Sequence, residues 1–179
     1  LRLRDHLQVA RAHVVGHSMG ALMALEFALR HPARCTRLLA LNAVFQRCAE
    51  QRAAVVERAR TLQSEGVAAT VEATIARWFG APVPAHLRET AALTRDILGD
   101  VNAQGYARAY GLFATCDAVH ADQLALLAMP ALFMTGEGDP SSSPAMSQAM
   151  AALAPQGQAE IVPGARHMMN LTDAEAVNA

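Results

Sequence analysis

The sequence is poor in aromatic residues and has almost no net charge, and both shortages exclude classes of function. Phe, Trp and Tyr make up 4% of its 179 residues, too few for the stacked platforms that bind single-stranded nucleic acid. The formal net charge is −1, so no basic field attracts nucleic acid or an anionic membrane. No apolar run reaches the roughly 20 residues of a membrane-spanning helix. We therefore predict neither a nucleic-acid partner nor a membrane partner.

Cysteine is also scarce, and the three that occur are far apart. Cys35, Cys48 and Cys116 form no CxxC pair, which argues against a zinc ribbon or a redox motif. Free thiols that are buried or half buried favour a reducing compartment, so we predict a cytoplasmic protein.

The pattern of the remaining residues is typical of an α/β fold. A 53% share of hydrophobic residues suffices for the core of one globular domain. Three short apolar runs predict buried strands, at residues 13–16, 38–41 and 130–136, and residues 159–163 are predicted to form a last strand. Helices are predicted at 19–29 and 144–153, and Thr172 is expected to cap a last helix. Such alternation predicts a mostly parallel sheet with helices on both faces.

A helical pattern with interleaved charges replaces this alternation between residues 44 and 118. Three breaks divide it into three or four short helices with no strand between them, at Gly66, 80–84 and Gly99. We predict a helical cap over 44–118, inserted into a core built from 1–43 and 119–179.

The run Gly16-His17-Ser18-Met19-Gly20 matches the G-x-S-x-G nucleophile elbow. This turn joins a strand to a helix and exposes a serine hydroxyl from a strained backbone. The flanking glycines are expected because strand and helix pass too close there for side chains. The pattern predicts Ser18 as a nucleophile and the backbone N–H of Met19 as an oxyanion donor at a helix N-terminus.

A serine nucleophile needs a base, and the base needs a group that orients it. In enzymes with this elbow, the acid and then the histidine follow the serine along the chain. Asp139 comes directly after the third predicted strand, and His167 comes directly after the fourth. We therefore predict a catalytic triad of Ser18, His167 and Asp139, with Glu137 as an alternative acid.

The remaining histidines suggest no metal site. His17 is predicted to pack or to line the substrate pocket, because its side chain points away from the nucleophile in an elbow turn. His13 and His17 have the spacing of two ligands on one helix face, but they straddle a strand and a turn. The other four carry no motif and are expected at the surface or at helix ends: His6, His31, His86 and His120.

Three segments resemble α/β-hydrolase fold proteins, and most closely the 3-oxoadipate enol-lactonase-like esterases and lactonases: GHSMGALMALEFALRHP, PALFMTGEGDPSSSP and PGARHMMNLTDAEAVN. In that family these segments hold the nucleophile, the acid and the histidine, which implies those roles for Ser18, Asp139 and His167. The resemblance also implies that 44–118 is the family's cap. Family members carry further strands before the elbow and an HG-type loop with the second oxyanion N–H. This sequence has no counterpart of that stretch, so we expect it to be part of a longer protein.

The predicted reaction is hydrolysis of a small ester or lactone through an acyl-enzyme, with no cofactor and no metal. Five aromatic residues of the predicted cap are candidates for the pocket or for ordinary core packing: Trp78, Phe79, Tyr106, Tyr110 and Phe113. The same triad also serves C–C bond hydrolysis, acyl transfer and cofactor-free haloperoxidase chemistry. A non-catalytic ligand-binding member of the fold is an alternative of another class, and a homo-oligomer is compatible with each hypothesis.

Overall fold

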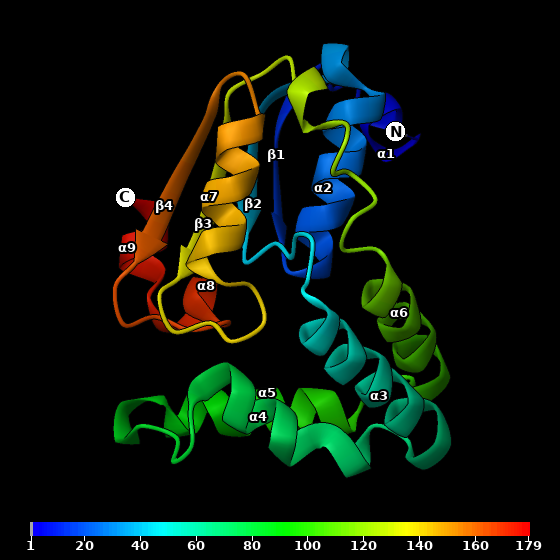
Figure 1. Ribbon diagram of the computed structural model, residues 1–179, viewed down its shortest axis with the longest axis vertical. Helices are drawn as coiled ribbons and strands as arrows, with labels where there is room; N and C mark the ends of the chain where they lie inside the picture. The colour runs from blue at the N-terminus through cyan, green and yellow to red at the C-terminus, as the bar shows by residue number, and fades with distance from the viewer. Residues whose placement is uncertain (1) are drawn as a thin grey trace.

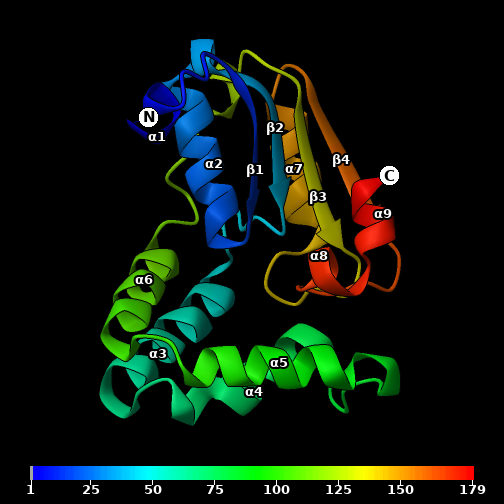
Figure 2. The ribbon, with the colours of Figure 1, turned by 180° about the vertical axis from the view of Figure 1, so that it is seen from behind.

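A sheet of four parallel strands forms the centre of the computed structural model, which describes residues 2–179 (Figures 1 and 2). The strands lie side by side in chain order: β1 (Ala12–His17), β2 (Cys35–Leu41), β3 (Ala131–Gly136) and β4 (Gly157–Val162). All neighbours pair in parallel, which confirms the predicted α/β class. The carboxyl ends of the strands therefore meet at one edge, where ligand sites of such sheets form.

Helices precede, connect and follow the strands. They are α1 (Arg2–His6), α2 (Met19–Arg30), α3 (Ala49–Glu65), α4 (Val71–Phe79), α5 (Arg88–Gly99), α6 (Ala103–Thr115), α7 (Pro144–Leu153), α8 (Met169–Thr172) and α9 (Ala174–Asn178). Short 3₁₀ helices occur at Pro32–Arg34, Ala68–Thr70, Ala85–Leu87 and Leu124–Leu126.

The two faces of the sheet are covered unequally. Helices α2 and α7 lie on the same face (Figure 1), where Leu25 and Met150 share one hydrophobic cluster with Phe133 of β3. On the other face, a smaller cluster includes Met169 of α8 near the carboxyl ends of the strands. Successive strand residues point to opposite faces, and Val15 of β1 is 60% exposed there. Helices therefore lie on both faces, as predicted, but those of the second face leave part of β1 exposed.

Helices α3 to α6 form a layer of their own, which we call the helical layer, opposite the carboxyl ends of the strands (Figures 1 and 2). It has a separate hydrophobic cluster around Ile75 and Phe79 of α4. Helix α3 packs on α6, and α4 packs on α5. Because this layer connects β2 to β3, it brings helical side chains over the edge of the sheet where Ser18 lies. The predicted limits of a cap at 44 and 118 stay a prediction.

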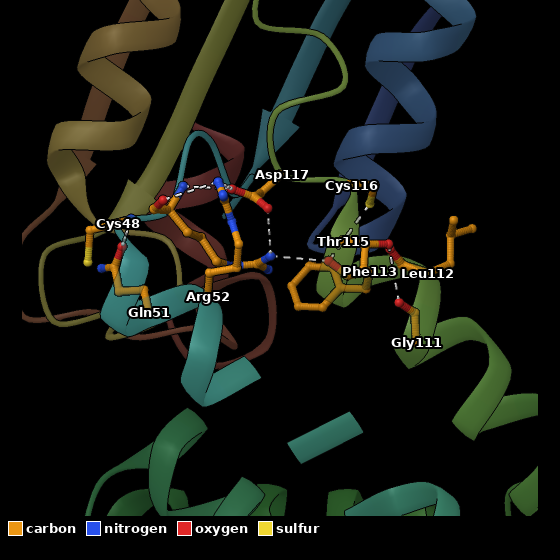
Figure 3. Close-up of polar contacts among 10 residues, drawn as sticks. Cys48, Gln51, Arg52, Gly111, Leu112, Phe113, Thr115, Cys116 and Asp117 are labelled. Atoms are coloured by element: carbon orange, nitrogen blue, oxygen red, sulfur yellow. Dashed lines mark hydrogen bonds and ion pairs between the residues drawn. The ribbon is translucent and has the colours of Figure 1, made fainter. Parts of the chain in front are cut away.

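One buried carboxylate ties together the two ends of the helical layer (Figure 3). Asp117, which follows α6, accepts hydrogen bonds from the backbone N–H of Arg47 at 2.7 Å and from the guanidinium of Arg52 at 3.3 Å. The guanidinium of Arg47 lies 3.5 Å from the same carboxylate, and both side chains are buried. Beside them, Gln51 accepts a hydrogen bond from the Cys48 N–H at the start of α3, at 3.1 Å. These contacts fix where the layer joins the sheet.

Two local predictions are wrong. Thr172 ends α8, and Asp173 occupies the position before α9; the Thr172 hydroxyl donates to the Met168 carbonyl at 3.2 Å. His120 is buried and forms a 2.9 Å contact with Glu26 of α2, because the loop after α6 packs against that helix. No helix within residues 2–179 is long and apolar enough to cross a membrane.

Candidate active site

Ser18 lies in the turn between β1 and α2, with φ 55° and ψ −119°. A non-glycine residue with positive φ costs roughly 1–3 kcal/mol, so the surrounding packing must hold this conformation. The Ser18 N–H donates to the Leu41 carbonyl of β2 at 2.8 Å. A Cβ on Gly16 would clash with the carbonyl oxygen of Gly20, so the close approach requires glycine at 16. A Cβ on Gly20 would meet nothing within 4 Å, and the expectation that both glycines are needed is wrong for this one.

A continuous chain of hydrogen bonds joins Ser18, His167 and Asp139. The His167 Nε2 lies 3.1 Å from the Ser18 Oγ, and its Nδ1 lies 2.7 Å from the Asp139 Oδ2. A carboxylate accepts, so the ring hydrogen is on Nδ1 and Nε2 is free to accept the serine proton. His167 and Asp139 are each 3% exposed, so water has little access to the hydrogen bond between them.

Asn42 is a polar contact of Asp139 that the sequence analysis missed. It directly follows β2, and its Nδ2 donates to the Asp139 Oδ2 at 2.8 Å. The Ser141 N–H donates to the other carboxylate oxygen, also at 2.8 Å. Burial by itself raises the pKa of Asp139, but these two donors and His167 outweigh it and leave the pKa below its usual value. Asn42 has φ 50°, and its own Oδ1 is buried without a partner among the described residues.

The loops after β3 and β4 touch because Gly136 lets them approach. A Cβ at this position would clash with the carbonyl oxygen of Ala165. The Gly138 N–H then donates to that same carbonyl at 2.9 Å. Glu137 points elsewhere: it is exposed, and its carboxylate accepts a hydrogen bond from the Gly164 N–H at 2.9 Å. The structure therefore places Asp139, and not Glu137, against the imidazole.

Two rings flank the imidazole of His167. The His17 Nε2 donates to the His167 carbonyl at 2.7 Å, with the ring centroids 5.0 Å apart. Burial lowers the pKa of His17, and the charge that His167 would carry when protonated lowers it further, so both favour the neutral form of His17. Trp78 of α4 stacks on His167 at 5.6 Å and 24°. His13 is exposed and contacts Thr36 instead, so the structure does not bring His13 and His17 to one site.

A cavity of about 420 Å³ opens above Ser18, between the sheet edge and the helical layer. Its lining includes the residues predicted to contact substrate: His17, Met19, Trp78, Tyr106, Tyr110 and Phe113. Phe79 is 1% exposed in the core of the helical layer, so its suggested place in the pocket is wrong. Met19 begins α2, and the first N–H groups of a helix have no partner within it. A carbonyl oxygen bound near Ser18 therefore has a donor available.

Three arginines of the helical layer and its leading loop also line the cavity: Arg47, Arg58 and Arg77. Nothing in the sequence marks these arginines as pocket residues, because the charges of this stretch are interleaved as they are on any solvated helix. Within residues 2–179, no group of three or more His, Cys, Asp or Glu side chains is arranged to hold a metal ion.

Known proteins resemble this chain in sequence and in fold. The sequence matches the family described as "alpha/beta hydrolase fold" over residues 1–174. It is 36% identical to the (E)-2-((N-methylformamido)methylene)succinate hydrolase of Acinetobacter baylyi, over 96% of this chain and 64% of that protein. The 3-oxoadipate enol-lactonase 1 of the same organism is 29% identical, over 98% of this chain and 64% of that protein. The crystal structure of the enol-lactonase from Burkholderia xenovorans superposes with a TM-score of 0.84 at 29% identity, over 98% of this chain and 65% of that one. The chain thus spans about two thirds of the length of these relatives.

Proposed function

Because this chain belongs to the α/β hydrolase fold family, we propose that it hydrolyses a carboxylic ester or lactone through an acyl-enzyme on Ser18. The observation that carries the proposal is the hydrogen-bond chain from Ser18 through His167 to Asp139 at the floor of a cavity. The relative named as an enol-lactonase supports a lactone as substrate, and the relative named as a hydrolase of a succinate derivative supports hydrolysis in general. The helical layer would act as the cap that encloses the substrate.

The proposed reaction has two halves that use the same base. The Ser18 Oγ attacks the substrate carbonyl while His167 Nε2 takes its proton. When the tetrahedral intermediate collapses, His167 returns that proton to the departing alkoxide, and the acyl group stays on Ser18. His167 then takes a proton from water, the resulting hydroxide attacks the acyl-enzyme, and the serine leaves with the proton. Asp139 holds the imidazole in the required tautomer and stabilises its charged form.

The oxyanion of both intermediates needs hydrogen-bond donors. We propose the Met19 N–H as one of them, since it lies next to Ser18 at the N-terminus of α2, where the helix dipole favours negative charge. One such donor contributes on the order of 10²–10³ in rate.

The test is hydrolysis of p-nitrophenyl acetate by the full-length protein. Ser18→Ala should abolish turnover and labelling by a fluorophosphonate probe, whereas Ser64→Ala, an exposed serine on α3, should leave both unchanged. Equal turnover by Ser18→Ala would sink the nucleophile assignment. A wild-type protein that is neither labelled nor active, yet binds a small lactone, would instead support a non-catalytic ligand-binding role.

A further inference from the structure

The loop after β4 carries the triad histidine, and three consecutive residues of this loop contact the helical layer. Arg166 lies against Gly80 at the end of α4, where an added Cβ would come within 3.5 Å of the Arg166 Nε. The His167 ring stacks on Trp78, and Met168 packs against the hydrophobic cluster of the helical layer. The helical layer therefore contacts the base of the triad, in addition to covering the cavity.

Trp78 presents the face of its indole to the imidazole of His167. The ring centroids are 5.6 Å apart and the ring planes are inclined by 24°, which is an offset-stacked arrangement. Trp78 is half buried and His167 is 3% exposed, so the contact is largely shielded from water. An aromatic face is partly negative and attracts a cation within about 6 Å of its centre, most strongly when water is excluded. The indole therefore favours the protonated form of His167.

Four charged or titratable groups surround His167 besides the indole. Asp139 contacts its Nδ1 at 2.7 Å and pairs with the charged form. His17 donates to the His167 carbonyl, and burial favours the neutral form of His17 by lowering its pKa. The positive groups are Arg77 of α4, whose charge interacts with Asp139, and Arg166 of the same loop. Replacing the indole leaves all four groups in the chain, so a change in the protonation of His167 can be assigned to the indole.

We propose that Trp78 is a positioning residue for the triad base, and that its indole stabilises the protonated form that His167 takes whenever it accepts the proton of Ser18 or of water. This proposal rests on the proposed hydrolase function. It gives the helical layer a part in the reaction that is separate from enclosing the substrate, because α4 holds the indole against the imidazole. An aliphatic side chain at this position fills the space beside the imidazole but has no negative face.

The pH dependence of kcat/KM for p-nitrophenyl acetate tests the proposal in the full-length protein. Trp78→Leu should move the acid limb to lower pH by roughly half a unit to one and a half units, the range expected for a shielded cation–π contact. On the plateau, kcat should fall by roughly threefold to thirtyfold, because the imidazolium formed during the reaction loses the same stabilisation. Trp78→Phe keeps a weaker aromatic face and should show smaller changes in both quantities. An acid limb of Trp78→Leu that coincides with the wild type, with only KM changed, would overturn the proposal.

Fluorinated tryptophans separate the charge of the ring face from the size of the ring. Each fluorine withdraws electron density from the face of the indole and changes its shape little. Monofluoro-, difluoro- and trifluorotryptophan, incorporated in place of Trp78 by a suppressor tRNA, should move the acid limb to lower pH in steps that grow with the number of fluorines. A limb that stays in one place across this series would refute the electrostatic role, because a side chain that only fills space is not sensitive to fluorine.

Phe113→Leu is the matched control for the loss of an aromatic ring from the cavity. Phe113 lines the same cavity, but its ring lies under the Arg47 guanidinium, with the Arg47 Cζ 4.5 Å from the ring centroid. The variant alters the cavity and should leave the acid limb at its wild-type pH. A shift as large as that of Trp78→Leu would show that the limb responds to the shape of the cavity and would contradict the proposal.

Direct titration of the imidazole needs no turnover. In Ser18→Ala, NMR with isotope-labelled histidine gives the pH at which His167 loses its proton, and the signals of His167 are assigned by their loss in His167→Gln. Adding Trp78→Leu should lower this pH by roughly half a unit to one and a half units. An unchanged titration would overturn the proposal even if the protein is an active hydrolase. A lowered titration in a protein that cleaves no ester would support the contact and contradict only the hydrolase function.

Discussion

Replacing Asn42 by glycine separates the support of the triad acid from the stability of the fold. Asn42 and His167 donate to the same oxygen, Asp139 Oδ2, at 2.8 and 2.7 Å. Without the Asn42 donor, that oxygen carries more charge toward the imidazole and stabilises its protonated form. Glycine is the suitable replacement, because φ at this position is 50° and an alanine there would add strain of its own.

The magnitudes follow from these contacts. A hydrogen bond to a charged group contributes about 1.5–3 kcal/mol, and one pKa unit corresponds to about 1.36 kcal/mol. If half of the lost interaction passes to the imidazolium, the acid limb of the kcat/KM profile moves up by about half a unit to one unit. On the plateau above that limb, kcat/KM should fall by no more than about tenfold, since the Ser141 N–H still holds the carboxylate.

Stability should change little in the same variant. Asn42→Gly loses two hydrogen bonds, the one to Asp139 and a longer one of 3.3 Å to the Thr135 hydroxyl. This loss is offset in part because the buried, unpartnered Oδ1 of Asn42 disappears with them, and such a group costs about 1–3 kcal/mol. We expect the free energy of unfolding to stay within about 1.5 kcal/mol of the wild type.

The assay is hydrolysis of p-nitrophenyl acetate between about pH 5 and pH 9, together with urea unfolding. Asn178→Gly makes the same substitution at an exposed position near the end of α9 and should alter neither measurement. An acid limb of Asn42→Gly that coincides with the wild type would refute the reasoning, as would a limb moved to lower pH.

Three further predictions concern the turn, the flanking histidine and the junction of the helical layer. Gly16→Ala should unfold at a temperature several degrees lower than the wild type because of its clash with the Gly20 carbonyl, whereas Gly20→Ala should melt normally; equal melting temperatures would contradict this. Because the pKa of His17 is lowered below its usual 6.5, its contribution to stability is fully present above pH 6.5 and is lost as the pH falls through the folded-state pKa. The urea concentration at the unfolding midpoint should therefore drop less between pH 7 and acid pH in His17→Gln than in the wild type. An equal drop in the two proteins would argue against this role of His17. Asp117→Asn leaves the buried Arg47 uncompensated and should cost about 3–5 kcal/mol in urea unfolding, while a loss below 1 kcal/mol would show that the pair is dispensable.

Much of the fold could be predicted because its signals are local. Short β-branched runs bounded by glycine and proline mark the strands, and the elbow is contiguous in the chain. Asp139 and His167 could be predicted as partners of Ser18 because the carboxyl ends of parallel strands lie at one edge of the sheet. A residue that directly follows such a strand is therefore near Ser18.

The residues that were missed depend on contacts between distant segments. Asn42 meets Asp139 only because β2 pairs with β3, and its neutral side chain gives no signal in the sequence. Arg58 and Arg77 resemble solvated helix charges until α3 and α4 are placed over the cavity. His120 was misplaced for the same reason, since the loop that buries it against α2 has no regular pattern.

The Asp117 junction has a consequence for how this protein can change over evolutionary time. The chain leaves the sheet near Arg47 and returns to it at Asp117. The carboxylate of Asp117 contacts both the backbone and the side chain of Arg47, so the two ends are held together. We therefore expect substitutions inside α3 to α6 to leave the loops that carry the serine, the imidazole and its acid in place, apart from the contact of Trp78 with His167. Trp78, Tyr106 and Tyr110, which line the cavity, lie between these two points, whereas the triad residues lie outside them. For the hydrolase that we propose, substitutions in these helices should therefore change which substrates fit the cavity without changing the groups that carry out the reaction.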